Sequence, residues 1–204
     1  MKTNYTKFIA SLLLVATIIL VSGCKKNSNT KTEVPTKLDE SPVTAFYEIG
    51  SFNAKVTTML GQQNYEIGIS FKPLNHGLLK AITIKLPANF NRNRITLWDK
   101  VTGTAILTWR VPILSNATVN NEYIMNLNEP YELTQNKEYI LSINVTDWYV
   151  RRTVGKDAIY PITAGNIQFL SYLESPTSTT NQEMPSVIIT DYVIGDLGFK
   201  FQPL

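Results

Sequence analysis

Cysteine and histidine are almost missing from this 204-residue chain, in which Cys24 and His76 are the single examples of each. One cysteine cannot form an intrachain disulfide, and one cysteine with one histidine falls short of the ligands of a closed zinc site. The core must therefore be stabilised by packing alone. A Ser-His-Asp triad would need His76, but its neighbours Asn75 and Gly77 indicate a polar turn residue instead.

The chain also lacks an excess of charge of either sign. It has 19 Lys and Arg against 16 Asp and Glu, and from Val43 onward the two groups are equal at 13 each. A neutral chain has no basic stripe of the kind that nucleic-acid binding requires. We therefore expect no nucleic-acid partner.

Long hydrophobic runs are absent except at the N-terminus. Lys2 and Lys7 precede residues 8–22, which form a 15-residue apolar run. This run is shorter than the roughly 20 residues that span a bilayer. Its basic flank and the small residues at its end are typical of a cleaved export signal. Residues 1–23 are therefore predicted to be a signal peptide.

The signal ends in Val21, Ser22, Gly23 and Cys24. These four residues resemble the lipobox of bacterial lipoproteins, in which the cysteine thiol is acylated and the chain is cleaved just before it. The resemblance implies lipidation of Cys24 and, at about 0.8 kcal/mol per buried methylene, stable attachment to a membrane of the bacterial cell envelope. The alternatives are an ordinary signal peptide with a chance cysteine and an uncleaved anchor.

Residues 24–43 are mostly polar, which is typical of a flexible tether. Lys25 and Lys26 follow the cysteine directly, whereas some Gram-negative bacteria place an acidic run there to send lipoproteins to the outer face. We expect attachment to the outer membrane, with the periplasmic and the surface face both open. Residues 44–204 have no linker-like break and suit one domain.

Strand-like alternation dominates residues 44–204. Apolar residues recur at every second position, the period of a strand with one buried face, in residues 65–72, 82–86, 139–145 and 197–202. Shorter strand candidates are residues 95–99, 105–111, 123–127, 167–173 and 187–189. No long helical period is present. The pattern predicts an all-β fold, an antiparallel β-sandwich or jelly roll of about eight or nine strands.

Several short motifs carry a resemblance to a known family. They are the segments at residues 65–71, 77–84, 96–99, 102–103, 106–107, 129–134, 137–142 and 197–201. Together they resemble a bacterial β-sandwich domain of unknown function found in exported proteins. The resemblance implies a fold whose relatives are often attached to carbohydrate-active or surface proteins, and it supplies no catalytic residues.

The most unusual local composition follows the strand predicted to end near Val145. Two large aromatic residues and two arginines come after an aspartate there: Asp147, Trp148, Tyr149, Arg151 and Arg152. Loops at strand ends often carry binding sites, and an aromatic ring with Arg and Asp beside it suits a sugar. The alternative is that Trp148 closes one end of the core and the arginines cover it.

Two other features have open interpretations. Trp98 alternates with Thr96, opposite Ile95 and Leu97, so it suits either the core or a binding platform. Residues 175–182 are rich in Ser, Thr and Asn, which indicates a solvated connection between strands more than a recognition surface.

Acidic residues offer two further kinds of site. Asp147, Asp157, Asp191 and Asp196 are candidate calcium ligands, but the dense Asp/Asn/Gly spacing of a calcium loop is missing, so no cofactor is predicted. Glycoside hydrolysis needs two carboxylates roughly 5 to 9 Å apart. The sequence singles out no such pair, so an enzyme is not expected.

These observations rank three functions. The first is a lipid-anchored envelope protein whose β-sandwich is a non-catalytic module that binds carbohydrate or another envelope polymer. The second is a structural or assembly lipoprotein that docks to a protein partner through sheet edges or an exposed apolar patch. The third is a glycan hydrolase, which requires two acids converging in a cleft. Exposed rings of Trp148 and Tyr149 beside a groove would favour the first, and two rings packed inside would remove the residues on which it rests.

Overall fold

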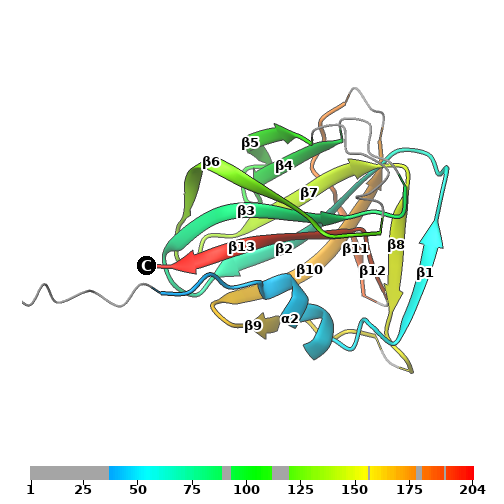
Figure 1. Ribbon diagram of the computed structural model, residues 1–204, viewed down its shortest axis with the longest axis horizontal. Helices are drawn as coiled ribbons and strands as arrows, with labels where there is room; N and C mark the ends of the chain where they lie inside the picture. The colour runs from blue at the N-terminus through cyan, green and yellow to red at the C-terminus, as the bar shows by residue number, and fades with distance from the viewer. Residues whose placement is uncertain (1–36, 89–92, 112–119, 156, 178–180, 191) are drawn as a thin grey trace, which may run out of the picture. The chain divides into compact units, whose positions relative to one another are not determined.

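Antiparallel sheets packed face to face make up most of the protein (Figure 1). The computed structural model describes residues 37–204 except residues 89–92, 112–119, 156, 178–180 and 191. Lys37–Leu204 form one compact unit. Cys24 and most of the predicted tether lie outside the described residues.

The larger sheet has seven strands in the order β11-β10-β2-β7-β4-β5, with β9 paired to β10. Every neighbouring pair is antiparallel. The strands are β2 (Tyr65–Pro73), β4 (Arg94–Asp99), β5 (Thr104–Arg110), β7 (Tyr139–Val145), β9 (Ile162–Ala164), β10 (Ile167–Pro176) and β11 (Val187–Ile189).

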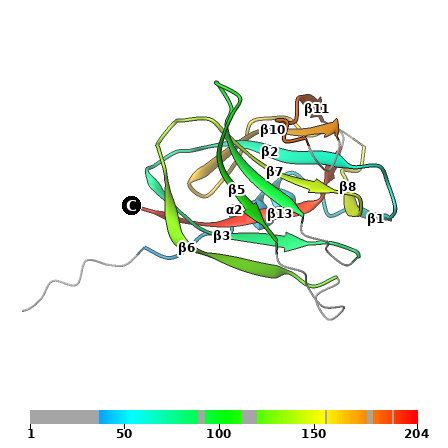
Figure 2. The ribbon, with the colours of Figure 1, turned by 90° about the horizontal axis from the view of Figure 1, so that it is seen from above.

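Two smaller sheets complete the fold. The sheet β13-β3-β6 forms the second layer of the sandwich, as Figure 2 shows. Its strands are β3 (Gly77–Lys85), β6 (Tyr123–Leu133) and β13 (Asp196–Pro203). The sheet β1-β8-β12 lies at one end of the sandwich in Figure 1. Its strands are β1 (Lys55–Met59), β8 (Trp148–Arg152) and β12 (Tyr192–Ile194).

The core lies between the two layers and follows the alternation of the strands. Alternating apolar residues of β2 and β7 are at most 1% exposed in it, and so are large apolar residues of β3 and β13. These residues are Ile67, Ile69, Phe71, Leu79, Ile82, Ile84, Tyr139, Leu141, Ile143, Val145, Phe199 and Phe201. Phe71 of β2 and Phe199 of β13 meet across the interface with ring centres 4.8 Å apart. Large apolar side chains from facing strands therefore hold the layers together without a disulfide.

The predicted antiparallel β-sandwich is confirmed, and each strand predicted from the sequence overlaps an observed one. The described residues form thirteen strands, more than the eight or nine predicted. The additional strands β1, β8, β9 and β12 have three to five residues each. A segment this short does not reveal an alternating pattern, so their sheet pairing depends on tertiary context.

Helix α2 (Pro42–Ile49) precedes the strands and was not predicted. Pro42 suits the first turn of a helix because its missing N–H needs no partner there. Val43, Phe46 and Tyr47 form a buried face with helical spacing, but eight residues are too few to show a period. None of the described residues belongs to a helix that is long and apolar enough to cross a bilayer.

The end of the predicted tether is part of the fold. Glu40 forms an antiparallel bridge to Phe201 of β13, with N–H to carbonyl distances of 2.7 and 3.0 Å. Nζ of Lys37 donates to the carbonyl of Leu204 at 2.5 Å. The folded unit therefore begins at Lys37, and α2 follows directly from this paired segment.

We expect Phe46→Ala to lower the free energy of unfolding by about 3 to 5 kcal/mol, because it leaves a cavity beside Phe52 and Phe169. Ile49→Ala is the matched control, since Ile49 lies in the same helix but is 58% exposed. Its effect should stay within about 1 kcal/mol. Urea unfolding followed by tryptophan fluorescence measures both. Equally small losses would show that α2 does not unfold together with the sandwich.

Candidate functional site

A cleft of about 370 Å³ opens beside helix α2, and we call it the α2 cleft. Its lining comes from α2, the turn after α2, β3, the segment before β6, β8 and β13. In Figure 1, α2 lies alongside β13 and the sheet containing β8 stands at the end of the sandwich. The cleft is therefore built at the junction of the helix, the smaller layer and the end sheet.

Arg151 fixes one wall of the α2 cleft. Its Nε and Nη2 donate to the two carboxylate oxygens of Asp196 at 2.7 and 2.6 Å, and its Nη1 donates to Oδ1 of Asn53 at 2.7 Å. The guanidinium also lies 4.9 Å from the ring centre of Tyr47. A bidentate pair has a defined geometry as well as strength, so these contacts join β8, β13 and the turn after α2.

The ion pair of Arg151 and Asp196 is buried, unlike an ordinary surface pair. The side chains of Arg151 and Asp196 are only 14% and 8% exposed. The hydrogen bonds that Arg151 donates to Asp196 raise the pKa of Arg151 above its ordinary value, so the guanidinium stays charged. Removing either partner would leave the other charge poorly solvated.

Tyr149 supports the part of the cleft lining that Lys85 and Asn120 supply. Nζ of Lys85, at the end of β3, lies 5.7 Å from the centre of its ring. The Tyr149 hydroxyl donates to Oδ1 of Asn120, and the Asn120 N–H donates to the carbonyl of Leu86 at 3.0 Å. Asn120 has φ +64°, a conformation that asparagine tolerates better than most residues. The segment before β6 is thereby held against β3.

The lining of the α2 cleft is rich in hydrogen-bonding groups of balanced charge. Lys85 and Arg151 are matched by Glu122 and Asp196. Neutral amide and hydroxyl groups come from Thr44, Asn53, Thr83, Asn120 and Asn121. Such a surface can both donate and accept hydrogen bonds without selecting for net charge.

The residues predicted to bind a ligand lie in or next to strand β8, which places their side chains on two different faces. Residues 147–152 were expected to form a strand-end loop, but Trp148–Arg152 is a strand paired with β1 and β12. Aromatic and β-branched residues favour this conformation. Because side chains alternate along a strand, Trp148 joins the core, whereas Arg151 lines the α2 cleft and Tyr149 contacts Asn120 of its lining.

The predicted sugar-stacking rings are buried. Trp148 is 6% exposed and packs edge-to-face on Tyr65 with ring centres 5.4 Å apart. Tyr149 is 8% exposed and contacts Lys85 and Asn120 instead of solvent. This arrangement agrees with the alternative in which Trp148 closes one end of the core. Neither ring offers an open face to a ligand.

The other two predicted residues have contacts away from the cleft. Asp147 accepts hydrogen bonds from the N–H of Gly61 at 2.6 Å and the hydroxyl of Thr146 at 2.9 Å. The guanidinium of Arg152 lies 4.7 Å from the ring centre of Tyr192. Of the five predicted residues, Arg151 lines the cleft and Tyr149 supports its wall.

Several lining residues gave no signal in the sequence. Lys85 and Thr83 are ordinary outward-facing positions of an alternating strand, and Asn53 and Asn120 are isolated polar residues between elements. Asp196 was considered only as a calcium ligand. Among the described residues no three His, Cys, Asp or Glu side chains are grouped to hold a metal ion. Asp191 lies outside the described residues.

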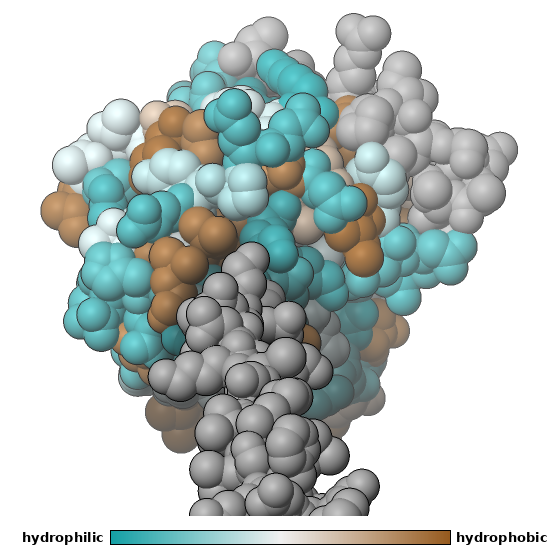
Figure 3. All heavy atoms as spheres, turned by 60° about the vertical axis from the view of Figure 1, so that its left-hand side comes forward, coloured by the Kyte–Doolittle hydropathy of each residue, from teal (hydrophilic) through white to brown (hydrophobic). Residues whose placement is uncertain are grey.

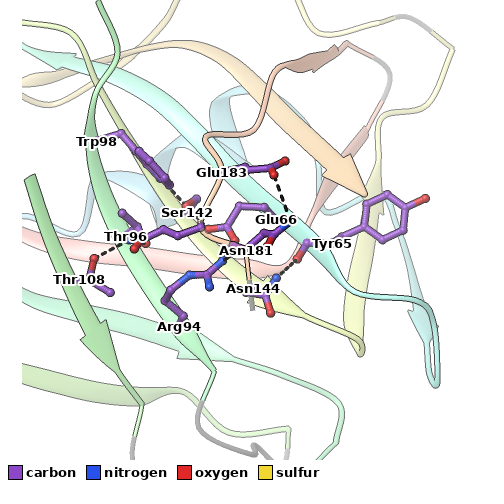
Figure 4. A network of polar contacts seen from close by, with 11 residues as sticks. Tyr65, Glu66, Arg94, Thr96, Trp98, Thr108, Ser142, Asn144, Asn181 and Glu183 are labelled. Carbon is purple, nitrogen blue, oxygen red and sulfur yellow. Dashed lines mark hydrogen bonds and ion pairs between the residues drawn. The ribbon is translucent and has the colours of Figure 1, made fainter. Parts of the chain in front are cut away.

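A second polar cluster lies on the outer face of the larger sheet (Figure 4). Nη2 of Arg94 donates to Oε2 of Glu66 at 2.8 Å, and both side chains are buried. The hydroxyl of Ser142 donates to Oε1 of Glu66 at 2.6 Å and accepts from Nε1 of Trp98 at 2.8 Å. Burial raises the pKa of Glu66, although its hydrogen bonds oppose that shift.

The segment before β11 covers this second cluster. Nη2 of Arg94 donates to the carbonyl of Asn181 at 2.6 Å, and Nε2 of Gln182 donates to Oγ1 of Thr108 at 2.6 Å. Met184 packs against Trp98, which is thus a buried residue and not a platform. The described part of the predicted solvated connection therefore lies over the sheet, where it closes the cluster to ligands.

Comparison with known proteins does not assign the chain to a family. No family model matches it, and no curated protein matches it. The resemblance to an exported β-sandwich family stays a prediction, and the function has to be argued from the geometry of the site.

We expect Glu66→Gln to lower the free energy of unfolding by about 3 to 5 kcal/mol, because it leaves the buried charge of Arg94 without a counter-charge. The double change Glu66→Leu with Arg94→Met removes both charges and should regain most of that loss. Denaturant unfolding of both variants provides the measurement. A double variant as unstable as the single one would show that hydrogen bonding, not charge pairing, stabilises the covered face.

Proposed function

We propose that this protein is a lipid-anchored lipoprotein of the bacterial cell envelope whose β-sandwich is a non-catalytic carbohydrate-binding module. The α2 cleft is its binding site. One observation carries the proposal: a cleft of balanced charge, rich in hydrogen-bonding groups, with the buried pair of Arg151 and Asp196 fixed in its wall.

A sugar matches the chemistry of this cleft. Sugar hydroxyls donate and accept hydrogen bonds, and so do the carboxamide and hydroxyl side chains that line the cleft. The volume of about 370 Å³ lies within the range of small-molecule sites. Because Arg151 and Asn120 are already fixed by hydrogen bonds, binding need not order them, which favours affinity.

The carboxylates of the cleft support binding more than hydrolysis. Both oxygens of Asp196 accept hydrogen bonds from Arg151, so this carboxylate orients the guanidinium. A glycosidase needs a second carboxylate free to give or take a proton at the scissile bond. Glu122 also lines the cleft. Asp196 cannot serve as its catalytic partner, because both of its oxygens are bonded to Arg151.

Protein docking has less support on the face drawn in Figure 3. On the face drawn in Figure 3, hydrophobic residues are scattered among hydrophilic ones and do not gather into one continuous patch. Large continuous apolar patches are what commonly mark protein-docking faces.

The predicted lipid anchor limits how far the module reaches. Thirteen residue steps separate Cys24 from Lys37, where the folded unit begins. A fully extended chain of that length spans at most about 45 Å. The module therefore samples glycans close to the membrane that holds it.

We expect Lys85→Met to weaken glycan binding by about tenfold or more, since it removes a hydrogen-bond donor from the cleft while keeping the length of the side chain. A glycan array with the Lys37–Leu204 unit identifies the sugar, and titration calorimetry measures the affinity. Lys100→Met is the matched control, because Lys100 lies in the turn after β4 and pairs with Glu138. An array without any binding, or equal affinity of both variants, contradicts the proposed site.

A further inference from the structure

Ser51 and Asn53, in and after the turn that follows α2, line different hollows. Asn53 lines the α2 cleft, and Ser51 lines a second hollow of about 620 Å³, which we call the turn hollow. The turn hollow is the larger of the two. The carbohydrate-binding role proposed above involves the α2 cleft alone.

The two hollows are neighbours along three separate stretches of chain. Tyr47, Asn53 and Arg151 line the α2 cleft, and residues two positions away, Ile49, Ser51 and Thr153, line the turn hollow. Residues two positions apart are at most about 7 Å from Cα to Cα. The linings of the two hollows therefore adjoin along α2, its turn and the end of β8.

The wall shared by the hollows is preformed. The N–H groups of Gly50 and Phe52 donate to the carbonyls of Phe46 and Tyr47, both at 2.9 Å. Phe52 is fully buried, and a Cβ on Gly50 would lie 2.4 Å from its ring. Only glycine fits there. The turn is therefore anchored to the core and presents both hollows in a fixed relation.

The turn hollow offers apolar surface next to polar groups. Ile49, Val154 and Ile159 on its rim are 58%, 75% and 84% exposed. Hydroxyls of Ser51 and Thr153 line the same hollow. A pyranose ring also combines an apolar C–H face with a polar edge, so it can cover the aliphatic side chains while its hydroxyls bind.

We infer that the α2 cleft and the turn hollow form one extended site for a saccharide chain of several units, not for a single sugar. This inference rests on the proposed function and deepens it. One unit lies in the polar α2 cleft, and the chain continues past the turn after α2, where later units cover Ile49, Val154 and Ile159.

The test compares chain lengths on the full-length protein in detergent. Titration calorimetry uses glucose and N-acetylglucosamine oligomers of one, two, four and six units. We expect affinity to rise about tenfold or more from one unit to four, because the second contact forms within an already bound ligand. Val154→Asp should cut the affinity for four and six units about fivefold or more and leave that for one unit unchanged.

Matched variants separate the two proposals. Val101→Asp is the control for Val154→Asp, since Val101 is 82% exposed and lies in the turn after β4. Equal affinity for all lengths, or equal effects of the two aspartates, would overturn the extended site while the α2 cleft remains supported by Lys85→Met. Binding to no oligomer, or binding that Lys85→Met does not alter, would overturn both. Circular dichroism confirms that each variant is folded.

Discussion

The pairing of Arg151 with Asp196 is the interaction on which the arrangement of the site depends. It joins the end sheet to the smaller layer of the sandwich, and through Asn53 and Tyr47 it also fixes helix α2 and its turn. A buried ion pair adds little net stability, because desolvation offsets much of the attraction. Its value here is geometric, since one guanidinium sets the relative positions of four elements.

The sandwich was predictable because its strands are long enough to show their period. In β2 and β7 every second residue enters the core, so the pattern survives in the sequence. Helix α2 and strand β9 are too short for that test, and their neighbours decide their conformation. Phe46 shows the difference: nothing local marks it, yet it contacts the aromatic rings of Phe52, Tyr160 and Phe169.

The site was predictable only in part, and the reason is again the strand period. The unusual run of aromatic and basic residues identified Arg151, but the same run is a strand, so Trp148 faces the core. Lys85, Asn53 and Asn120 reach the cleft from distant parts of the chain. Packing of the layers brings these three residues together, and no local sequence pattern predicts that.

The bridge between Glu40 and Phe201 lies where a pulling force from the N-terminal side would reach the folded unit. A pull from the N-terminal side, such as the proposed lipid anchor would exert, would act first on the contacts of Lys37 with Leu204 and Gln202, then on this pairing, and then on α2. The same pairing covers an edge that would otherwise be open to foreign strands. If the proposed anchor and the proposed glycan site both act, tension between them would pass along α2, which borders the α2 cleft, so that pulling and ligand release would share one path.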